Sequence, residues 1–342
     1  MLWSARDKVM FQTVFSPSRA EALQLMDFAR YLWAENIADQ VTSHPLFAPS
    51  TLWRHWAGQS FVGLSLEKLI LQGGHAFPHS IEVAAEDSPT GLLAVLRQCV
   101  GNVRGASTRT RMREGRDPRS LTAAFARVYP RAHIPSEHES WYARHPNPYF
   151  RCLEAYLLRG KPELPSRMLE VGGGACVNVA FYHSLNRRMQ SIVVDLPETI
   201  FFGYTFLRTV FPDMRIALPH ETAEADTVRE ADVVFLLPTQ TDLIPDESMD
   251  FCFNMASFQE MSIATVNEYL ALMARKLRVA GRLVSMNFEI SRYFKENTLK
   301  SYDLAGYHSV ADTKYAPFAS NLAGQGLRVI HLEVEKRRAD GA

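Results

Sequence analysis

A glycine-rich bend between an apolar strand and a helical segment constrains this sequence more than any other feature. Gly172, Gly173 and Gly174 lie inside the segment MLEVGGGACVNVA, residues 168–180. An apolar run ends just after Glu170, and a helical pattern begins directly after the glycines. Because glycine has no Cβ, the chain can turn sharply there and its backbone can approach a ligand closely. Unpaired N–H groups at the start of the following helix then face that ligand.

A second acidic residue follows at a spacing that fits the same site. Asp195 ends the next apolar segment, SIVVDLP, 25 residues after Glu170. At the tip of the second strand, a carboxylate is placed to accept hydrogen bonds from both hydroxyls of a ribose. The two acidic residues and the bend therefore predict a nucleoside-binding site.

Three kinds of ligand site compete for this pattern, beside a purely structural turn. A dinucleotide site needs glycine at the sixth position of GxGxxG, which is Val177 here, and the Gly-Lys-Ser/Thr ending of a P-loop is absent. An acid directly before the glycines repels a pyrophosphate and attracts an ammonium or sulfonium group. We therefore predict an S-adenosylmethionine site.

The sequence resembles class I S-adenosylmethionine-dependent methyltransferases, and more narrowly the sugar O-methyltransferase family. The likeness rests on LEVGGG, on VVDLPE (193–198) and on FCFNMASFQEM (251–261), with weaker support from STLW (50–53). Its core covers about residues 166–287, with scattered matches before. The third glycine of the class pattern falls on Cys176, so the sequence departs from the pattern at that one position and the start of the helix is bulkier there.

The resemblance implies a set of cofactor-binding residues. Glu170, Gly172 and Gly174, with Gly173 between them, would line the methionine part, and Asp195 would bind the ribose. Leu196 would lie beside the adenine, as would Gln240 or, second, Thr239. Asn254 would end the fourth strand beside the sulfonium methyl group.

The acceptor side is expected just after Asn254. Ser257 and Gln259 are the predicted substrate-binding residues, and Glu260 is the first candidate for a general base, which a poorly nucleophilic hydroxyl needs. Glu260 could instead cap the helix that begins near Ser262. His308 is the second candidate, because its loop is expected to follow the fifth strand and overhang the site; it could equally be a surface histidine.

An arginine-rich stretch at residues 104–119 permits two interpretations. It is either a solvated loop or, through Arg111 and Arg113, a clamp for a phosphate or carboxylate on the acceptor, such as a nucleotide-linked sugar. The scattered histidines do not form a tight zinc-binding set, and we predict no protein-bound metal.

Two domains are expected. Residues 1–161 show helical patterns, including residues 19–41, capped by Ser16 or Ser18, and residues 51–71, and predict a mainly helical N-terminal domain on the acceptor side. That domain is also a candidate homodimer surface.

Residues 162–342 alternate strands with helices, which predicts a Rossmann-like, doubly wound α/β domain with a mostly parallel sheet. The predicted strands are 168–171, 191–195, 232–237, 249–254, 282–287 and 327–335, and the predicted helices are 176–186, 198–210, 263–277 and 313–323.

Composition narrows the class of partner. Lysine plus arginine and aspartate plus glutamate both number 37, so the net charge is zero and neither nucleic acid nor an anionic membrane is an expected partner. The chain has no apolar run long enough to span a bilayer, no signal-like N-terminus and only 4 scattered cysteines, so we expect a reducing cytoplasm. We predict an enzyme that transfers the methyl group of S-adenosylmethionine to a sugar or sugar-like hydroxyl of a small-molecule acceptor. The alternatives are O- or N-methylation of another metabolite, and a non-catalytic protein that binds S-adenosylmethionine.

Overall fold

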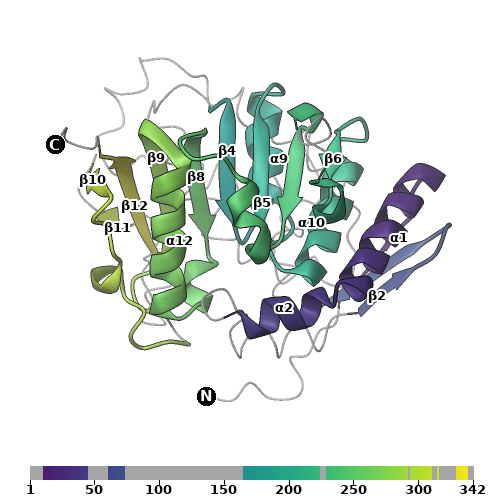
Figure 1. Ribbon diagram of the computed structural model, residues 1–342, viewed down its shortest axis with the longest axis horizontal. Coiled ribbons are helices and arrows are strands. Elements are labelled where there is room, and N and C mark those ends of the chain that lie inside the picture. The colour runs from purple at the N-terminus through teal and green to yellow at the C-terminus, as the bar shows by residue number, and fades with distance from the viewer. Residues whose placement is uncertain are drawn as a thin grey trace, which may run out of the picture.

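A central sheet dominates the computed structural model of the protein. The structure describes residues 11–44, 61–73, 165–223, 229–291, 293–309, 314–315 and 329–337. Within these ranges the sheet has nine strands in the order β10-β12-β9-β8-β4-β5-β7-β6, with β11 paired to β12 (Figure 1). The strands are β4 (Arg167–Val171), β5 (Gln190–Val194), β6 (Ile216–Ala217), β7 (Val233–Leu236), β8 (Met249–Met255), β9 (Leu277–Phe288), β10 (Tyr307–Ser309), β11 (Lys314–Tyr315) and β12 (Val329–Lys336).

The neighbouring strands β6, β7, β5, β4, β8 and β9 pair in parallel, and β12 pairs with β9 in antiparallel orientation. The central strands β4, β5, β7 and β8 are mostly apolar and buried, because helices cover both faces of the sheet. This arrangement confirms the Rossmann-like α/β class predicted for the C-terminal part of the chain. The helix predicted from residue 313 is wrong at residues 314–315, which pair with β12 as a strand.

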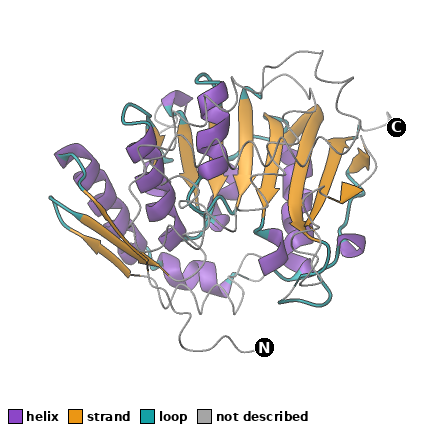
Figure 2. Ribbon diagram, turned by 180° about the vertical axis from the view of Figure 1, so that it is seen from behind, coloured by secondary structure: helices purple, strands orange, loops and turns teal. Residues whose placement is uncertain are grey.

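Helices lie on both faces of the sheet. α9 (Val177–Leu185) and α10 (Pro197–Val210) pack on one face, in front in Figure 2, and α12 (Ile263–Lys276) packs on the other, in front in Figure 1. Short 3-10 turns follow several strands: η5 (Pro219–Glu221), η6 (Pro238–Leu243), η7 (Phe258–Glu260) and η8 (Leu299–Ser301).

The order of the strands identifies one position on the sheet as a ligand site. From β4 the chain moves outward to β5 and to β6 at the edge, comes back to β7 between them, and then crosses to β8 on the other side of β4. In open α/β sheets, ligands bind outside the carboxyl ends of the strands at such a switch point. The glycine bend after β4 lies there.

The described N-terminal residues contain more strand than the sequence predicts. They form α1 (Arg19–Ala34), α2 (Ile37–Ser43) and an antiparallel sheet in the order β1-β3-β2, from Phe11–Phe15, Leu69–Gly73 and Phe61–Leu64. The helix expected over residues 51–71 is therefore wrong at residues 61–64 and 69–71. Pairing with β1, far away in sequence, overrides the local helical pattern.

The long helix predicted over residues 19–41 is divided in two. Ser18 caps α1 as expected, because its side chain accepts a hydrogen bond from the Glu21 N–H. Asn36 then adopts a left-handed conformation, with φ of 48°, and the chain restarts as α2. Asparagine is one of the few residues that tolerate this conformation.

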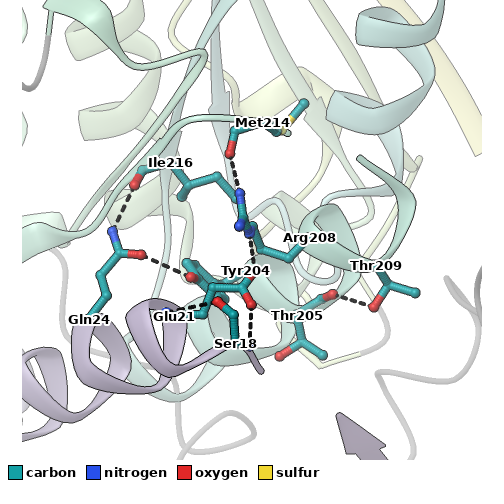
Figure 3. Close-up of polar contacts among 9 residues, drawn as sticks. All are labelled: Ser18, Glu21, Gln24, Tyr204, Thr205, Arg208, Thr209, Met214 and Ile216. Carbon is teal, nitrogen blue, oxygen red and sulfur yellow. Dashed lines mark hydrogen bonds and ion pairs between the residues drawn. The ribbon is translucent and has the colours of Figure 1, made fainter. Parts of the chain in front are cut away.

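Helix α1 is bound to the α/β unit by polar contacts (Figure 3). Tyr204 donates a 2.9 Å hydrogen bond to the Gln24 side chain, which in turn donates to the Ile216 carbonyl at 2.9 Å. Glu21 and Arg208 form a largely buried ion pair beside them. α2 lies against η6, below the carboxyl ends of the parallel strands in Figure 1. The two N-terminal helices therefore contact turns at the carboxyl ends of the strands, the same end of the sheet at which the bend lies.

Candidate functional site

The bend requires glycine at its first position for two reasons. Gly172 has φ of 70°, a conformation that side chains disfavour, and its N–H donates a 2.8 Å hydrogen bond to the Val194 carbonyl. A Cβ at Gly172 would lie 2.0 Å from Ser257 Oγ. The bend after β4 and the turn after β8 are thus in direct contact through Gly172 and Ser257.

Cys176 replaces the third glycine of the class pattern and still adopts a left-handed backbone conformation, with φ of 58°. It is fully buried and begins α9. Gly203 of α10 packs against it, because a Cβ at Gly203 would lie 2.7 Å from Cys176 Sγ and 3.1 Å from the Gly174 carbonyl oxygen. Sequence reasoning missed Gly203, although a lone glycine inside a predicted helix is a signal of close packing.

Asp195 reaches the bend from the end of β5. Its Oδ2 accepts a 2.8 Å hydrogen bond from the Gly174 N–H, and its Oδ1 accepts one of 2.8 Å from the Leu196 N–H. Burial raises the pKa of Asp195 to about 7, a rise that these backbone hydrogen bonds oppose and the nearby Glu198 reinforces. The structure thus brings Asp195 to the bend, as predicted.

Glu170, at the end of β4, is fully buried beside the bend. Its Oε1 accepts a 2.7 Å hydrogen bond from Asn178 Nδ2. Within the described part of the chain, Glu170 Oε2 and Asn178 Oδ1 are buried without a hydrogen-bond partner. Burial raises the pKa of Glu170 to about 8, and the neighbouring Asp195 adds to the rise. Asn178 was missed, although a polar residue in an otherwise apolar helical segment could have pointed to it.

Asn254 joins three elements at the switch point. Its Nδ2 donates to the Val171 carbonyl at 2.8 Å, and its Oδ1 accepts from the Phe258 N–H at 3.3 Å and from Asn287 Nδ2 at 2.8 Å. It is completely buried. In this structure Asn254 holds the ends of β4, β8 and β9 together, and a contact with the cofactor remains a prediction.

The predicted acceptor residues lie in η7 or directly before it. Glu260 ends this turn and is half-buried, and its N–H donates to the Ser257 carbonyl at 3.0 Å. Ser262, not Glu260, caps α12, because the Ser262 side chain accepts from the Thr265 N–H. Gln259 is buried and its Oε1 accepts from the Phe288 N–H at 2.9 Å, so this oxygen bonds to the protein backbone instead of facing an acceptor.

The adenine side differs from the prediction for one residue. Gln240 Oε1 accepts from the Leu237 N–H at 3.0 Å, and its Nε2 donates to the Pro219 carbonyl at 3.0 Å. The Gln240 amide therefore connects η6 to η5, and since both of its ends already have backbone partners it is less suited to bind adenine. Thr239 and Leu196 are half-buried at the carboxyl edge, where the prediction placed them.

His308 does not overhang the site, contrary to the expectation. It lies on β10, separated from β4 by β12, β9 and β8. Registers align His308 with Glu335, Glu335 with Arg282, Arg282 with Phe251 and Phe251 with Met168, at the amino end of β4. Its Nε2 is 3.6 Å from Glu335 Oε1. The chain extends β12 and β10 to the far edge of the sheet, which a linear sequence pattern does not reveal.

Arg111 and Arg113 lie outside the described residues, as do the histidines considered for a metal site. Across the described ranges, no group of three or more histidine, cysteine, aspartate or glutamate side chains is arranged to hold a metal ion. In the same ranges, every helix is too short or too polar to cross a bilayer.

Comparison with known proteins gives distant structural likeness only. No protein-family model matches the chain, and no curated protein matches it. Geranyl diphosphate C-methyltransferase from Streptomyces coelicolor A3(2) is 12% identical, with 74% of this chain and 100% of that chain covered and a TM-score of 0.41. A SAM-dependent methyltransferase from Aquifex aeolicus is 13% identical, with 65% and 100% covered and a TM-score of 0.36. A geranyl diphosphate methyltransferase bound to SAM is 10% identical, with 60% and 94% covered and a TM-score of 0.40. Similarity this distant identifies neither the acceptor nor the reaction of this chain.

Proposed function

We propose that this protein is an S-adenosylmethionine-dependent methyltransferase acting on a small-molecule hydroxyl. One observation carries the proposal: Glu170, one residue before the end of β4, and Asp195, directly after the adjacent parallel strand β5, lie at the same end of the sheet, beside a left-handed glycine bend. Asp195 bonds directly to the Gly174 N–H of that bend. Two buried carboxylates this close favour a ligand that combines a cationic group with a ribose.

The orphaned atoms at the bend fit the amino-acid part of such a ligand. Glu170 Oε2 and Asn178 Oδ1 are buried acceptors without donors among the described residues, and an ammonium group is a strong donor. Each oxygen of Asp195 accepts one backbone N–H and retains capacity for a ribose hydroxyl. A pyrophosphate would be repelled by the same carboxylates. The cofactor, when bound, supplies a methyl group already activated on sulfonium.

The protein's own contribution is orientation and proton transfer. Alignment of the reacting groups can supply about 7–11 kcal/mol of the barrier. Glu260, on the turn that contacts the bend through Ser257, is the proposed base that takes the acceptor proton. A base at this position contributes roughly 10²- to 10⁴-fold in rate.

The proposed acceptor is a sugar or sugar-like hydroxyl, the class that the LEVGGG and VVDLPE motifs imply. The N-terminal residues 1–161 would form the acceptor side, and α1 and α2 flank the edge of the sheet in agreement with that role. Methyl transfer to another oxygen or nitrogen acceptor is the alternative outcome of the acceptor screen described below.

Calorimetry with S-adenosylmethionine and its demethylated product tests the shared premise. Wild-type protein should bind both, and Asp195→Ala and Gly172→Val proteins, shown to be folded by circular dichroism, should bind at least tenfold more weakly. Asp213→Ala, which removes an exposed aspartate before β6, is the matched control and should bind normally. Unchanged affinity in Asp195→Ala would contradict the proposal.

A second step identifies the acceptor. Labelled methyl donor is incubated with panels of sugars, nucleotide-linked sugars, phenols and amines, and product is detected by mass spectrometry. Turnover of sugars supports the proposed class, and turnover of phenols or amines alone replaces it. Binding of the donor with no turnover of any acceptor would favour the non-catalytic alternative.

A further inference from the structure

The turn that carries the candidate base is supported from behind by buried side chains. Asn297 Nδ2 donates hydrogen bonds to two carbonyls on either side of Glu260, those of Phe258 at 2.7 Å and Met261 at 2.8 Å. Ser291 Oγ donates to the Gln259 carbonyl at 2.5 Å. The carbonyls of Phe258, Gln259 and Met261 thus accept hydrogen bonds from side chains that follow β9.

A second group of bonds connects this turn to the cofactor bend. Asn287 Oδ1 accepts from the Gln259 N–H at 3.2 Å, and Asn287 Nδ2 donates to Asn254 Oδ1 at 2.8 Å. Asn254 in turn donates to the Val171 carbonyl, one residue before the glycines. A continuous path of hydrogen bonds therefore runs from the bend, through Asn254 and Asn287, to the backbone of η7.

The burial of these side chains argues for a geometric role. Asn254, Asn287, Ser291 and Asn297 are exposed by 0%, 4%, 5% and 2% respectively. Burying an amide or hydroxyl is unfavourable unless its hydrogen bonds are replaced, and apolar residues would fill the same space at lower cost. A satisfied buried network rigidifies the segments that it joins.

We propose that Asn297 and Asn287 are positioning residues of the methyl-transfer site. They hold η7 in place, so that Ser257 stays against Gly172 and Glu260 stays at a fixed distance from the bend. This inference depends on the proposed function. Neither residue touches the ligand; both act through the backbone of the turn.

The test compares Asn297 with a matched asparagine elsewhere. Asn267 on α12 also bonds to two backbone groups of a neighbouring loop, the Ser301 carbonyl and the Asp303 N–H, but on the exposed side of the domain. Asn297→Ala, Asn297→Asp and Asn267→Ala are prepared. The aspartate variant keeps the size of the side chain and can donate at most one of the two bonds, and neither when it is ionised.

Both Asn297 variants should lower kcat by about 10- to 100-fold, since a small displacement of a reacting group has an effect of that size. Their Kd for S-adenosylmethionine should stay within twofold of wild type. Asn267→Ala should lower Tm by no more than Asn297→Ala, because its hydrogen bonds are exposed to solvent, and should leave kcat unchanged. In a Glu260→Gln background, Asn297→Ala should cause little further loss, because the group that it positions is already absent. Hydrogen exchange at residues 257–261 should increase only in the Asn297 variants.

Two results would overturn the inference and can be told apart. If wild-type protein turns over acceptor and the Asn297 variants lose no more kcat than Asn267→Ala, the positioning role is wrong and the proposed function stands. If wild-type protein fails to bind S-adenosylmethionine, the proposed function is wrong and the inference falls with it.

Discussion

Ser257 Oγ occupies the space that a side chain on Gly172 would need, 2.0 Å from the position of the missing Cβ. These residues lie on different turns, after β8 and after β4, and this contact brings the proposed acceptor side and the proposed cofactor side together. Gly172 also has a left-handed backbone conformation. Its replacement therefore combines a steric clash with backbone strain.

Gly172→Ala should weaken binding of S-adenosylmethionine at least tenfold, as measured by calorimetry. The double variant Gly172→Ala/Ser257→Gly should recover part of the affinity, because it removes the clash and leaves only a backbone strain of about 1–2 kcal/mol. Equal affinities in the single and double variants would show that the contact with Ser257 does not matter.

The buried carboxylates predict that folding stability falls as pH rises. The pKa of Glu170 is raised to about 8 and that of Asp195 to about 7, against ordinary values of 4.5 and 3.8. The folded protein therefore retains protons that the unfolded chain releases. The contribution of these two groups to the free energy of unfolding is fully present below about pH 4. It is lost as the pH rises from there through 7 to 8, by on the order of 1 kcal/mol per pH unit for each group. Urea unfolding of wild type and Glu170→Gln between pH 5.5 and 8.5 measures the slope. It should be smaller in Glu170→Gln and unchanged in the exposed control Glu268→Gln.

Affinity for the cationic ligand should change with pH in the opposite direction. A sulfonium or ammonium group favours the ionised form of Glu170, so binding of S-adenosylmethionine should strengthen as pH rises from 6 to 8.5. Calorimetry in buffers of different ionisation enthalpy would detect the protons released on binding. A constant affinity over this range, in a protein that does bind, would show that Glu170 does not interact with the cationic group.

Substitutions of the two candidate general bases, Glu260 and His308, should have very different effects on kcat. Glu260→Gln is expected to lower kcat by roughly 10²- to 10⁴-fold with cofactor affinity retained. His308→Ala is expected to leave kcat within twofold, because His308 lies on β10 beside Glu335, at the amino end of the sheet. Steady-state rates at saturating acceptor decide between them. A large effect of His308→Ala would require a different arrangement of the C-terminal strands.

Packing of α10 onto the bend should make Gly203 intolerant of a side chain. Alanine normally stabilises a helix by about 1 kcal/mol relative to glycine. Here a Cβ would lie 2.7 Å from Cys176 Sγ and 3.1 Å from both the Gly174 carbonyl oxygen and Phe235 Cε1. Gly203→Ala should therefore lower Tm despite the gain in propensity. Gly203→Ala/Cys176→Ala should be less destabilised than the sum of the single variants, as thermal unfolding would show.

Much of the part of this site that is proposed to bind the nucleoside follows from local sequence. The bend, the acid before it and the acid at the next strand tip depend on residues within 30 positions of one another. Parallel pairing of two consecutive strands is enough to bring Glu170 and Asp195 together. The sequence also limited the cap of α1 to Ser16 or Ser18, of which Ser18 is the cap, because capping involves a side chain and a backbone group three residues apart.

The other half depended on contacts that no local pattern contains. Strands β2 and β3 form where a helix was predicted, because β3 pairs with the distant strand β1 on one side and with β2 on the other. His308 lies near the far edge of the large sheet because of the order of the C-terminal strands. The Gln240 amide donates to the Pro219 carbonyl and the Gln259 amide oxygen accepts from the Phe288 N–H, so each side chain has a backbone partner on another element that no local pattern predicted. A sequence determines which groups can turn, bond or ionise within a few residues. Only packing determines which remote partner satisfies each buried polar atom, because the free energy of that choice depends on the whole fold.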